Sequence, residues 1–299
     1  MPCQNPNVEG RWHETLHASS LVRLSVPLLA GEPGEDILDN LQPAGVRDGF
    51  NLFCDGGLVA GHITEPVAPD MAAQAQQLYR RLLGLIRGRH LYRVWHYMPR
   101  INDRTGRLEN YRAFCRGRSL AFEEAFGPAF KRVVSAASAV GCDDHRLTMI
   151  FVGGGAVPRH VENPEQVPAY DYPQEHGPRP PSFARATVAE EGGRRFIFVS
   201  GTSAIKGHAT IASDSVGEQL SCTLDNLRLI SRAAGLGDKL GAGNHSRRFK
   251  IFLRHAEDLP FVRTRIEDEL LRPGDRAVYL RADICRAALK IEIEAALMG

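Results

Sequence analysis

The sequence predicts an α+β protein made of two related units, each a mixed sheet covered by helices on one face. The main observation is that a hairpin, helix, strand, helix and strand occur in this order twice along the 299 residues. A segment at 158–182 lies between the two sets and carries seven of the 18 prolines. A loop of this length is a linker or a functional loop. We therefore expect an N-terminal unit at 1–145 and a C-terminal unit at 146–299.

The N-terminal unit is expected to begin with an irregular arm, because its first 40 or so residues contain proline and glycine and are weakly periodic. Gly56-Gly57 marks a hairpin turn, and Asp70 and Gly88 are suited to cap a helix. The predicted elements are a strand at 19–29, a hairpin at 50–63, a helix at 70–88, a strand at 90–98, a helix at 127–141 and a strand at 146–155.

The C-terminal unit repeats this order. Gly192-Gly193 marks the hairpin turn, and Asp258 precedes Pro260 at a helix start. The predicted elements are a hairpin at 184–202, a helix at 216–235, a strand at 249–255, a helix at 258–271 and strands at 277–285 and 290–297.

Composition narrows the class of partner. The formal net charge is only +2 and there is no run of five basic residues, so nucleic acid is not expected to bind. The N-terminus lacks the pattern of a signal peptide, and no apolar run approaches the ~20 residues that span a bilayer. The six cysteines are scattered without a CxxC pair, which argues against a zinc site and a disulfide framework. We expect a soluble cytoplasmic protein that acts on a small molecule.

The stretch "KIEIE" at 290–294 raises the question of where its acids point. Alternation places Ile291 and Ile293 on one face of a strand and Glu292 and Glu294 on the other. Cys285 lies seven residues before Glu292, at the end of the preceding predicted strand. The polar face is either solvated or part of a pocket, and the period alone does not decide between them.

Two family resemblances bear on this question. The second half resembles the RidA (YjgF) family in "GEQ", "CTLDNL", "KIFLR" and "ALKIEIEAAL". The chain from about residue 93 to its end resembles the chorismatases. The strings that carry this second resemblance are "RVWHYMPRIN", "YRAFCRGRSLAF", "ENPEQVPAYDYP", "PSFARA", "SGTSAIKGHAT" and "ADICRAALKIEIEA". These strings include irregular loops whose sequence is not dictated by packing.

The resemblance implies two RidA-like (chorismate-mutase-like) units and release of pyruvate from chorismate without a metal or an organic cofactor. The expected products are 3-hydroxybenzoate and pyruvate, with 4-hydroxybenzoate open as a further product. A dihydroxy-cyclohexadiene carboxylate is an alternative product. The residues are also compatible with a RidA-type imine deaminase and with a binder that has no catalytic activity. Because the chain already contains two units, we expect a monomer, with most of the active site in the C-terminal unit.

The resemblance also implies roles for five side chains. Glu292 matches the catalytic glutamate, which would protonate the methylene carbon of the enol ether as a general acid. Cys285 matches a thiol of the family members that aromatise the ring, although a lone cysteine in a strand is more often a core residue. Arg118 and Arg265 match arginines that bind carboxylates, and Tyr111 matches a tyrosine that faces the substrate. From helical spacing alone, Arg265 would extend to solvent.

The segment "SGTSAIKGH" follows the apolar run "FIFV", and its small residues permit close approach of a ligand to the backbone. Gly201, Thr202 and Ser203 are therefore candidate substrate-binding residues. The resemblance leads us to expect Ala or Gly at position 203, so Ser203 leaves the product ratio open. The histidines His160, His176 and His208 lack HxH or HExxH spacing, and no metal site is expected there.

Overall fold

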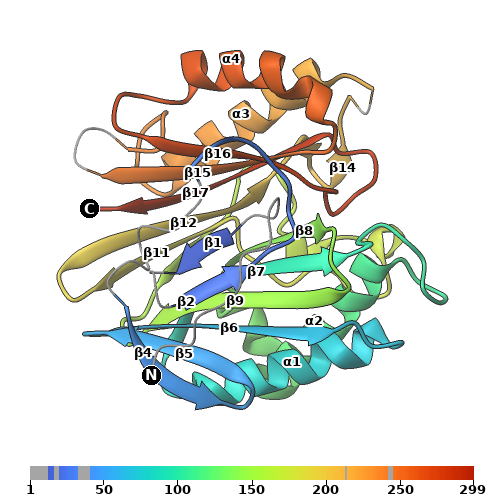
Figure 1. Ribbon diagram of the computed structural model, residues 1–299, viewed down its shortest axis with the longest axis vertical. Helices are drawn as coiled ribbons and strands as arrows, with labels where there is room; N and C mark the ends of the chain where they lie inside the picture. Colours follow the sequence, from blue (N-terminus) through green and yellow to red (C-terminus); the bar gives the residue numbers. More distant parts are fainter. Residues whose placement is uncertain (1–12, 17–19, 33–40, 213, 242–244) are drawn as a thin grey trace.

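The chain folds into two sheets packed face to face, with helices on both outer faces (Figure 1). The structure is a computed structural model and describes all residues except 1–12, 17–19, 33–40, 213 and 242–244. In Figure 1, α3 and α4 lie above one sheet, and α1 and α2 lie below the other. The layers therefore follow the order helix, sheet, sheet, helix, and the predicted fold class is confirmed.

The first sheet has six strands in the order β4-β5-β6-β9-β7-β8. All neighbours are antiparallel except β7 and β8, which are parallel. Its elements are β4 (Gln42–Arg47), β5 (Phe50–Asp55), β6 (Leu58–Pro66), α1 (Met71–Leu85), β7 (His90–Pro99), α2 (Asn110–Phe126), a 3-10 turn (Gly127–Arg132), β8 (Ala136–Cys142) and β9 (Arg146–Gly154). Asp70 caps α1, since its side chain accepts a hydrogen bond from the Ala73 N–H.

The second sheet has seven strands in the order β10-β11-β12-β17-β15-β16-β3. The run from β11 to β16 repeats the run from β5 to β8, including one parallel pair, β15 with β16. Its elements are β3 (Leu28–Gly31), β10 (Arg159–Val161), β11 (Ala186–Glu191), β12 (Arg194–Thr202), α3 (Val216–Ala233), β15 (Ser246–Leu253), α4 (Leu259–Glu269), β16 (Arg276–Arg281) and β17 (Ile291–Met298). Two short pairs, β1 (His13–Leu16) with β2 (Ser20–Arg23) and β13 (Ile205–Lys206) with β14 (Ala209–Thr210), lie outside these sheets.

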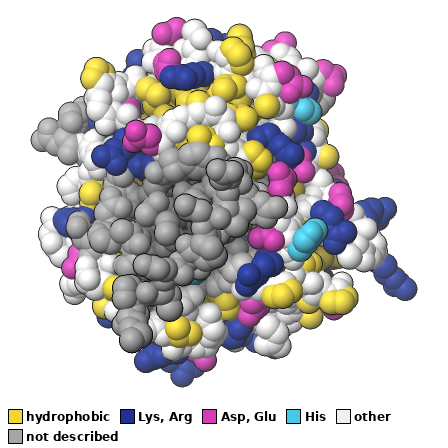
Figure 2. Space-filling view, viewed as in Figure 1, with side chains coloured by type: hydrophobic (Ala, Val, Ile, Leu, Met, Phe, Trp, Pro, Cys, Tyr) yellow, Lys and Arg dark blue, Asp and Glu magenta, His cyan; other side chains and the backbone are white. Residues whose placement is uncertain are grey.

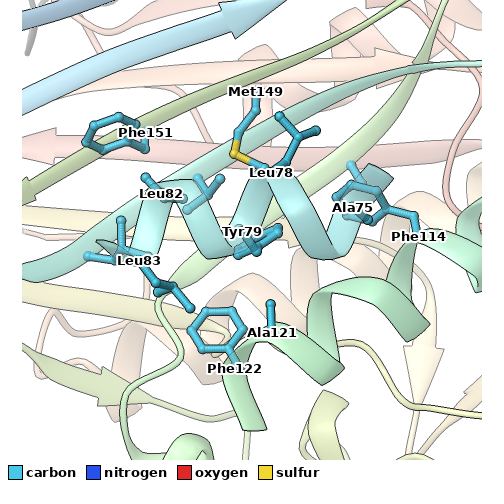
Figure 3. Close-up of a cluster of buried hydrophobic side chains, with 14 of the residues drawn as sticks. Ala75, Leu78, Tyr79, Leu82, Leu83, Phe114, Ala121, Phe122, Met149 and Phe151 are labelled. Atoms are coloured by element: carbon cyan, nitrogen blue, oxygen red, sulfur yellow. The ribbon is translucent and has the colours of Figure 1, made fainter. Parts of the chain in front are cut away.

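Three apolar clusters hold the layers together. Trp95 and Phe198 meet edge to face between the two sheets, with ring centroids 6.2 Å apart. Figure 3 shows a second cluster, in which Tyr79 of α1 and Phe122 of α2 pack together beneath the first sheet. The third cluster includes Ile293 and joins β17 to the inner faces of α3 and α4. Each unit therefore has a core of its own, and a shared core joins the units.

Three sequence predictions differ from the structure in the first unit. The helix is at Asn110–Phe126, and the predicted helix at 127–141 is a 3-10 turn followed by β8. Gly127 has a φ of 57°, so "GP" marks the end of α2 and not the start of a helix. The first sheet also continues to Gly154 through β9, past the predicted boundary at 145, and β3 joins the second sheet.

In the C-terminal unit, the hairpin, both helices and the last strand are where the sequence predicts them. The strand predicted at 277–285 ends at Arg281, which leaves Cys285 in the turn before β17. Within the described ranges, no helix is long and apolar enough to cross a membrane. Figure 2 shows basic and acidic side chains interspersed over the visible face.

Candidate active site

A cavity of about 460 Å³ lies between the two units, beside the end of β12 and the start of β17. The first unit contributes the start of α2 with Tyr111 and Arg112, and the second contributes Glu292 on β17. The long connection at 158–182 supplies further wall residues, including Tyr172 and His176. The connection therefore forms part of the cavity wall and does more than link the two units.

Glu292 is buried against the cavity, with an exposed fraction of 3%. β12 bulges between Val199 and Thr202 where it pairs with β17, and the bulge brings the Gly201 backbone against the glutamate. A Cβ atom built at Gly201 would lie only 2.0 Å from Glu292 Oε1. Within the described part of the chain, Oε1 has no hydrogen-bond partner. Glycine at 201 thus makes room for a carboxyl oxygen that is free to act on a ligand.

Glu294 lies on the same face of β17 and is equally buried, but it is fully engaged. Its carboxylate accepts hydrogen bonds from Arg93 at 2.6 Å, Trp95 at 2.8 Å and Ser138 at 2.5 Å. Lys250 Nζ lies 3.5 Å away on β15. The polar face of "KIEIE" therefore points between the sheets and not to solvent. The two acids therefore differ in their hydrogen-bond partners.

The electrostatic environment keeps these two acids in different protonation states. Burial raises the pKa of Glu292 to about 8, and the negative charge of Glu294 adds to the rise. Burial also acts to raise the pKa of Glu294, but Arg93 and Lys250 outweigh it and the pKa is lowered. At neutral pH, Glu292 is therefore largely a neutral acid next to a carboxylate. This is the state in which a carboxyl group can donate a proton.

Cys285 and Tyr111 line the cavity from opposite units. Burial raises the pKa of the Cys285 thiol to about 12, and Glu292 adds to this rise. Burial also raises the pKa of Tyr111 well above its usual value. Both groups are therefore protonated at neutral pH. Cys285 is therefore not a preformed thiolate.

Arg118 lies behind this wall, two turns after Tyr111 on α2. It is 3% exposed, and its guanidinium lies over the ring of Tyr79 at 5.2 Å and over that of Phe122 at 6.0 Å. Among the described residues, Nε and Nη2 have no hydrogen-bond partner. Arg118 is not among the residues that line the cavity, so the structure places this predicted substrate-binding residue behind the wall.

The structure does not bring Arg265 to the cavity, which corrects the sequence prediction. Arg265 lies on α4, pairs with Glu269 one turn later and is 32% exposed. α4 packs on the face of the second sheet that carries Ile293, whereas Glu292 points to the opposite face. The sheet therefore separates this arginine from the acid. The solvated position expected from helical spacing is the correct one.

Besides Arg112, two further arginines line the cavity and were not selected from the sequence. Arg185 donates to the Tyr172 hydroxyl at 2.7 Å, and Arg286 donates to the His208 carbonyl oxygen at 2.8 Å. Tyr172 lies between them, 5.7 Å from one guanidinium and 5.3 Å from the other. Both residues occur in strings that carry the family resemblance, "PSFARA" and "ADICRAAL". Their position in those strings is the sequence signal that could have identified them as candidate site residues.

Gly201 and Thr202 at the end of β12, and Ser203 directly after it, line the cavity. Thr202 is held by its own strand, since its hydroxyl donates to the Ser200 carbonyl oxygen at 2.9 Å. Ser203 is buried near the Glu292 carboxyl and acts to lower its pKa, against the larger effect of burial.

Comparison with known proteins shows which family the chain belongs to. Residues 39–153 match a family model described as chorismatase FkbO/Hyg5-like, N-terminal. A crystal structure of a chorismatase superposes with a TM-score of 0.77 at 30% identity, covering 86% of this chain and 80% of that one. The chain belongs to the chorismatase family.

Two relatives in this family are similar over most of the chain. A Streptomyces hygroscopicus protein described as 3-hydroxybenzoate synthase is 37% identical over 265 residues, 84% of this chain and 75% of that protein. A Streptomyces rapamycinicus chorismatase is 35% identical over 227 residues, 71% of this chain and 65% of that protein. The family model covers most of the first unit, and the chorismatase structure extends the likeness across both units.

Proposed function

We propose that this chain converts chorismate to 3-hydroxybenzoate and pyruvate. The observation that carries the proposal is Glu292, a buried acid with a raised pKa at the wall of a cavity shared by both units. The relative described as 3-hydroxybenzoate synthase supports the same product. The elements of chorismate equal those of 3-hydroxybenzoate plus pyruvate, so this route consumes no water. Formation of a dihydroxy-cyclohexadiene carboxylate would require one water molecule.

The first step is proton transfer from Glu292 to the methylene carbon of the enolpyruvyl ether. The methylene becomes a methyl group, and the adjacent ether carbon becomes an oxocarbenium ion, which weakens the bond from the ether oxygen to the ring. Because Glu292 is neutral before the step and anionic after it, the new carboxylate stabilises the cation beside it. A positioned proton donor of this kind contributes typically about 10²–10⁴ in rate.

The second step releases pyruvate. The ring hydroxyl oxygen attacks the neighbouring ring carbon, the bond to the ether oxygen breaks, and its electron pair forms the ketone of pyruvate. The hydroxyl proton returns to Glu292, which restores the acid. The resulting arene-oxide-like ring opens and loses a ring proton, and the alkoxide oxygen gains one to give the phenol. Cys285 supplies a protonated thiol beside this ring.

Guanidinium groups in and behind the cavity wall are available for the two carboxylates of chorismate. Arg185 and Arg286 line the cavity with Tyr172 between them, and Arg118 offers two free donors behind Tyr111. Arginine binds a carboxylate through two parallel hydrogen bonds, which also fixes its orientation. We assign carboxylate binding to these residues in place of Arg265.

The decisive experiment for this mechanism is Glu292→Gln, which keeps the shape of the side chain and removes the acid. We expect kcat to fall by about 10²–10⁴ with the fold retained. In the wild type, kcat falls as the pH rises through about 8, because the acid must be protonated. A variant that keeps substantial activity would overturn the assignment of Glu292 as the acid.

Cys285→Ala tests the thiol separately from the acid. We expect pyruvate release to continue while the product shifts from 3-hydroxybenzoate towards the non-aromatic diol, because the ring step loses its protonated neighbour. Cys222→Ala is the matched control, since Cys222 is a buried cysteine outside the cavity wall. An unchanged product profile in Cys285→Ala would remove the thiol from the chemistry.

We also propose that the protein is cytoplasmic and that its active form is a monomer. Five described cysteines are free thiols, which supports a reducing, cytoplasmic compartment. The cavity is lined by both units of one chain, which supports a monomer as the active form. Size-exclusion chromatography with light scattering would test the monomer, and an active species found only as an oligomer would contradict it.

A further inference from the structure

Glu175, His176 and His208 bring three ligand atoms together at the wall of the cavity. His176 Nε2 lies 3.0 Å from His208 Nδ1. Glu175 Oε1 lies 3.3 Å from the first of these nitrogens and 3.2 Å from the second. Two of these residues belong to the 3-10 turn Gln174–His176, and His208 lies in the turn between β13 and β14.

These distances match the spacing of ligand atoms around a tetrahedral zinc ion. Zinc takes histidine nitrogens and carboxylate oxygens at about 2.0–2.2 Å, so two ligands of a tetrahedron lie about 3.3–3.5 Å apart. The three observed distances, from 3.0 to 3.3 Å, fall within a few tenths of an ångström of this edge. Two histidines and one glutamate are also the protein ligands of known zinc sites that keep a fourth position open.

The surroundings hold the ligands in place. Arg286 donates to the backbone carbonyl oxygen of His208, and the Tyr172 ring lies 5.3 Å from that of His176. The charges that face the cluster are Glu175, Arg286 and Arg112. One carboxylate in the set offsets part of the repulsion that the guanidinium groups exert on a dication.

We propose that Glu175, His176 and His208 form a site for a divalent ion of the zinc class at the cavity wall. Glu175 and His176 line the cavity, so an ion held there stands next to the space for the substrate. The fourth position of the ion can accept a carboxylate oxygen of a ligand in that space. The site is separate from the acid Glu292, and its occupation restricts or redirects binding of an anionic substrate. The inference does not rest on the proposed reaction, because metal binding is measured without chorismate.

The test uses the purified full-length chain freed of metal by chelation and then dialysed against Zn²⁺ or Co²⁺. We expect one ion bound per chain, and for Co²⁺ the intense visible absorption of a four-coordinate site. His208→Ala should weaken binding at least about 10–100-fold, the loss that removal of even an outer-shell partner causes. His145→Ala is the control, because this exposed histidine lies between β8 and β9 and outside the cluster.

Each outcome decides the proposal. One ion per chain that is lost in His208→Ala and retained in His145→Ala supports the site. Glu175→Gln should also weaken binding while it leaves both histidines in place, which guards against a misfolded variant as the explanation. Absence of binding at one ion per chain, or binding that all three variants retain, overturns the proposal. The result is independent of whether chorismate is turned over.

Discussion

Two glutamates on the same face of β17, Glu292 and Glu294, are buried to the same extent but differ in protonation at neutral pH. The difference comes from their neighbours. Arg93 and Lys250 lower the pKa of Glu294. Glu292 Oε1, next to Gly201, has no hydrogen-bond partner among the described residues. Because the pKa of Glu292 differs between the folded and unfolded chain, the free energy of unfolding depends on pH.

The stability of the wild type relative to Glu292→Gln should fall as the pH rises from about 5 to about 8. The pKa of Glu292 rises from 4.5 to about 8 on folding, so both states hold the proton below about pH 4.5. Above this pH the unfolded chain releases the proton and the folded chain keeps it. Folding then loses up to roughly 1.4 kcal/mol per pH unit, until the folded state also ionises near pH 8. Urea unfolding of both proteins at several pH values measures this change, and a constant difference would contradict it.

Gly201→Ala should reduce activity sharply, because its Cβ would lie 2.0 Å from Glu292 Oε1 and would displace the acid. We expect kcat to fall by at least about 10²-fold, the contribution of a positioned proton donor. Gly155→Ala is the control, because its Cβ would approach only Glu191 Oε1, at 3.8 Å. Equal activity of both variants would show that the close approach at 201 does not position the acid.

Some residues of the site could be predicted from the sequence, and others could not. Glu292, Cys285, Tyr111 and the residues from 201 to 203 were found because the family resemblance covers them, and all of them line the cavity. Arg265 was misplaced because sequence spacing to Glu292 does not record the face of the sheet on which a helix packs. Arg185 and Arg286 were missed because many arginines occur in the chain, and only the tertiary fold shows which ones meet around Tyr172.

At the element scale, α1 and α2 pack so closely that a glycine is required between them. A Cβ at Gly117 of α2 would lie 2.0 Å from the Ala72 carbonyl oxygen of α1. Gly117→Ala should therefore push the helices apart and lower the free energy of unfolding by about 1–3 kcal/mol. Gly84→Ala, on an exposed site of α1 with open space around it, should instead raise it by about 0.5–1 kcal/mol. Chemical unfolding measures both, and effects of the same sign would contradict the packing described.

The sequence predicted elements well where turn chemistry and periodicity agreed. The hairpin at Gly192-Gly193, the helix capped by Asp70 and the alternating strand β17 are examples. It failed at 127–141, where small apolar residues of β8 are buried on both faces and show no period of two. The glycine before Pro128 resembles a helix start in the sequence, although its positive φ makes it the end of α2.

At the scale of the whole molecule, a buried ionic network ties the two sheets together. Arg93 and Ser138 of the first sheet bind Glu294 of the second, and the Arg93–Glu294 distance is 2.6 Å. Arg93→Met should lower the free energy of unfolding by about 3–5 kcal/mol, since it leaves a buried carboxylate with fewer partners. The double variant Arg93→Met with Glu294→Gln should be destabilised by less than the sum of its parts.

A surface ion pair is the control for this prediction. Arg80 and Glu124 are 2.7 Å apart, but both side chains are more than 40% exposed. Arg80→Ala should therefore change the free energy of unfolding far less than Arg93→Met does, because solvent screens this pair. If Arg93→Met cost no more than Arg80→Ala, the network would not be what couples the sheets.

The most direct test of the proposed reaction is to incubate the purified chain with chorismate in H₂¹⁸O. Pyruvate is followed by a coupled dehydrogenase assay. The aromatic products are separated by chromatography, and their ¹⁸O content is measured by mass spectrometry. The mechanism predicts pyruvate together with 3-hydroxybenzoate whose phenolic oxygen carries no ¹⁸O, because that oxygen comes from the ring hydroxyl. Release of pyruvate with only a non-aromatic diol, or no release of pyruvate at all, would contradict it.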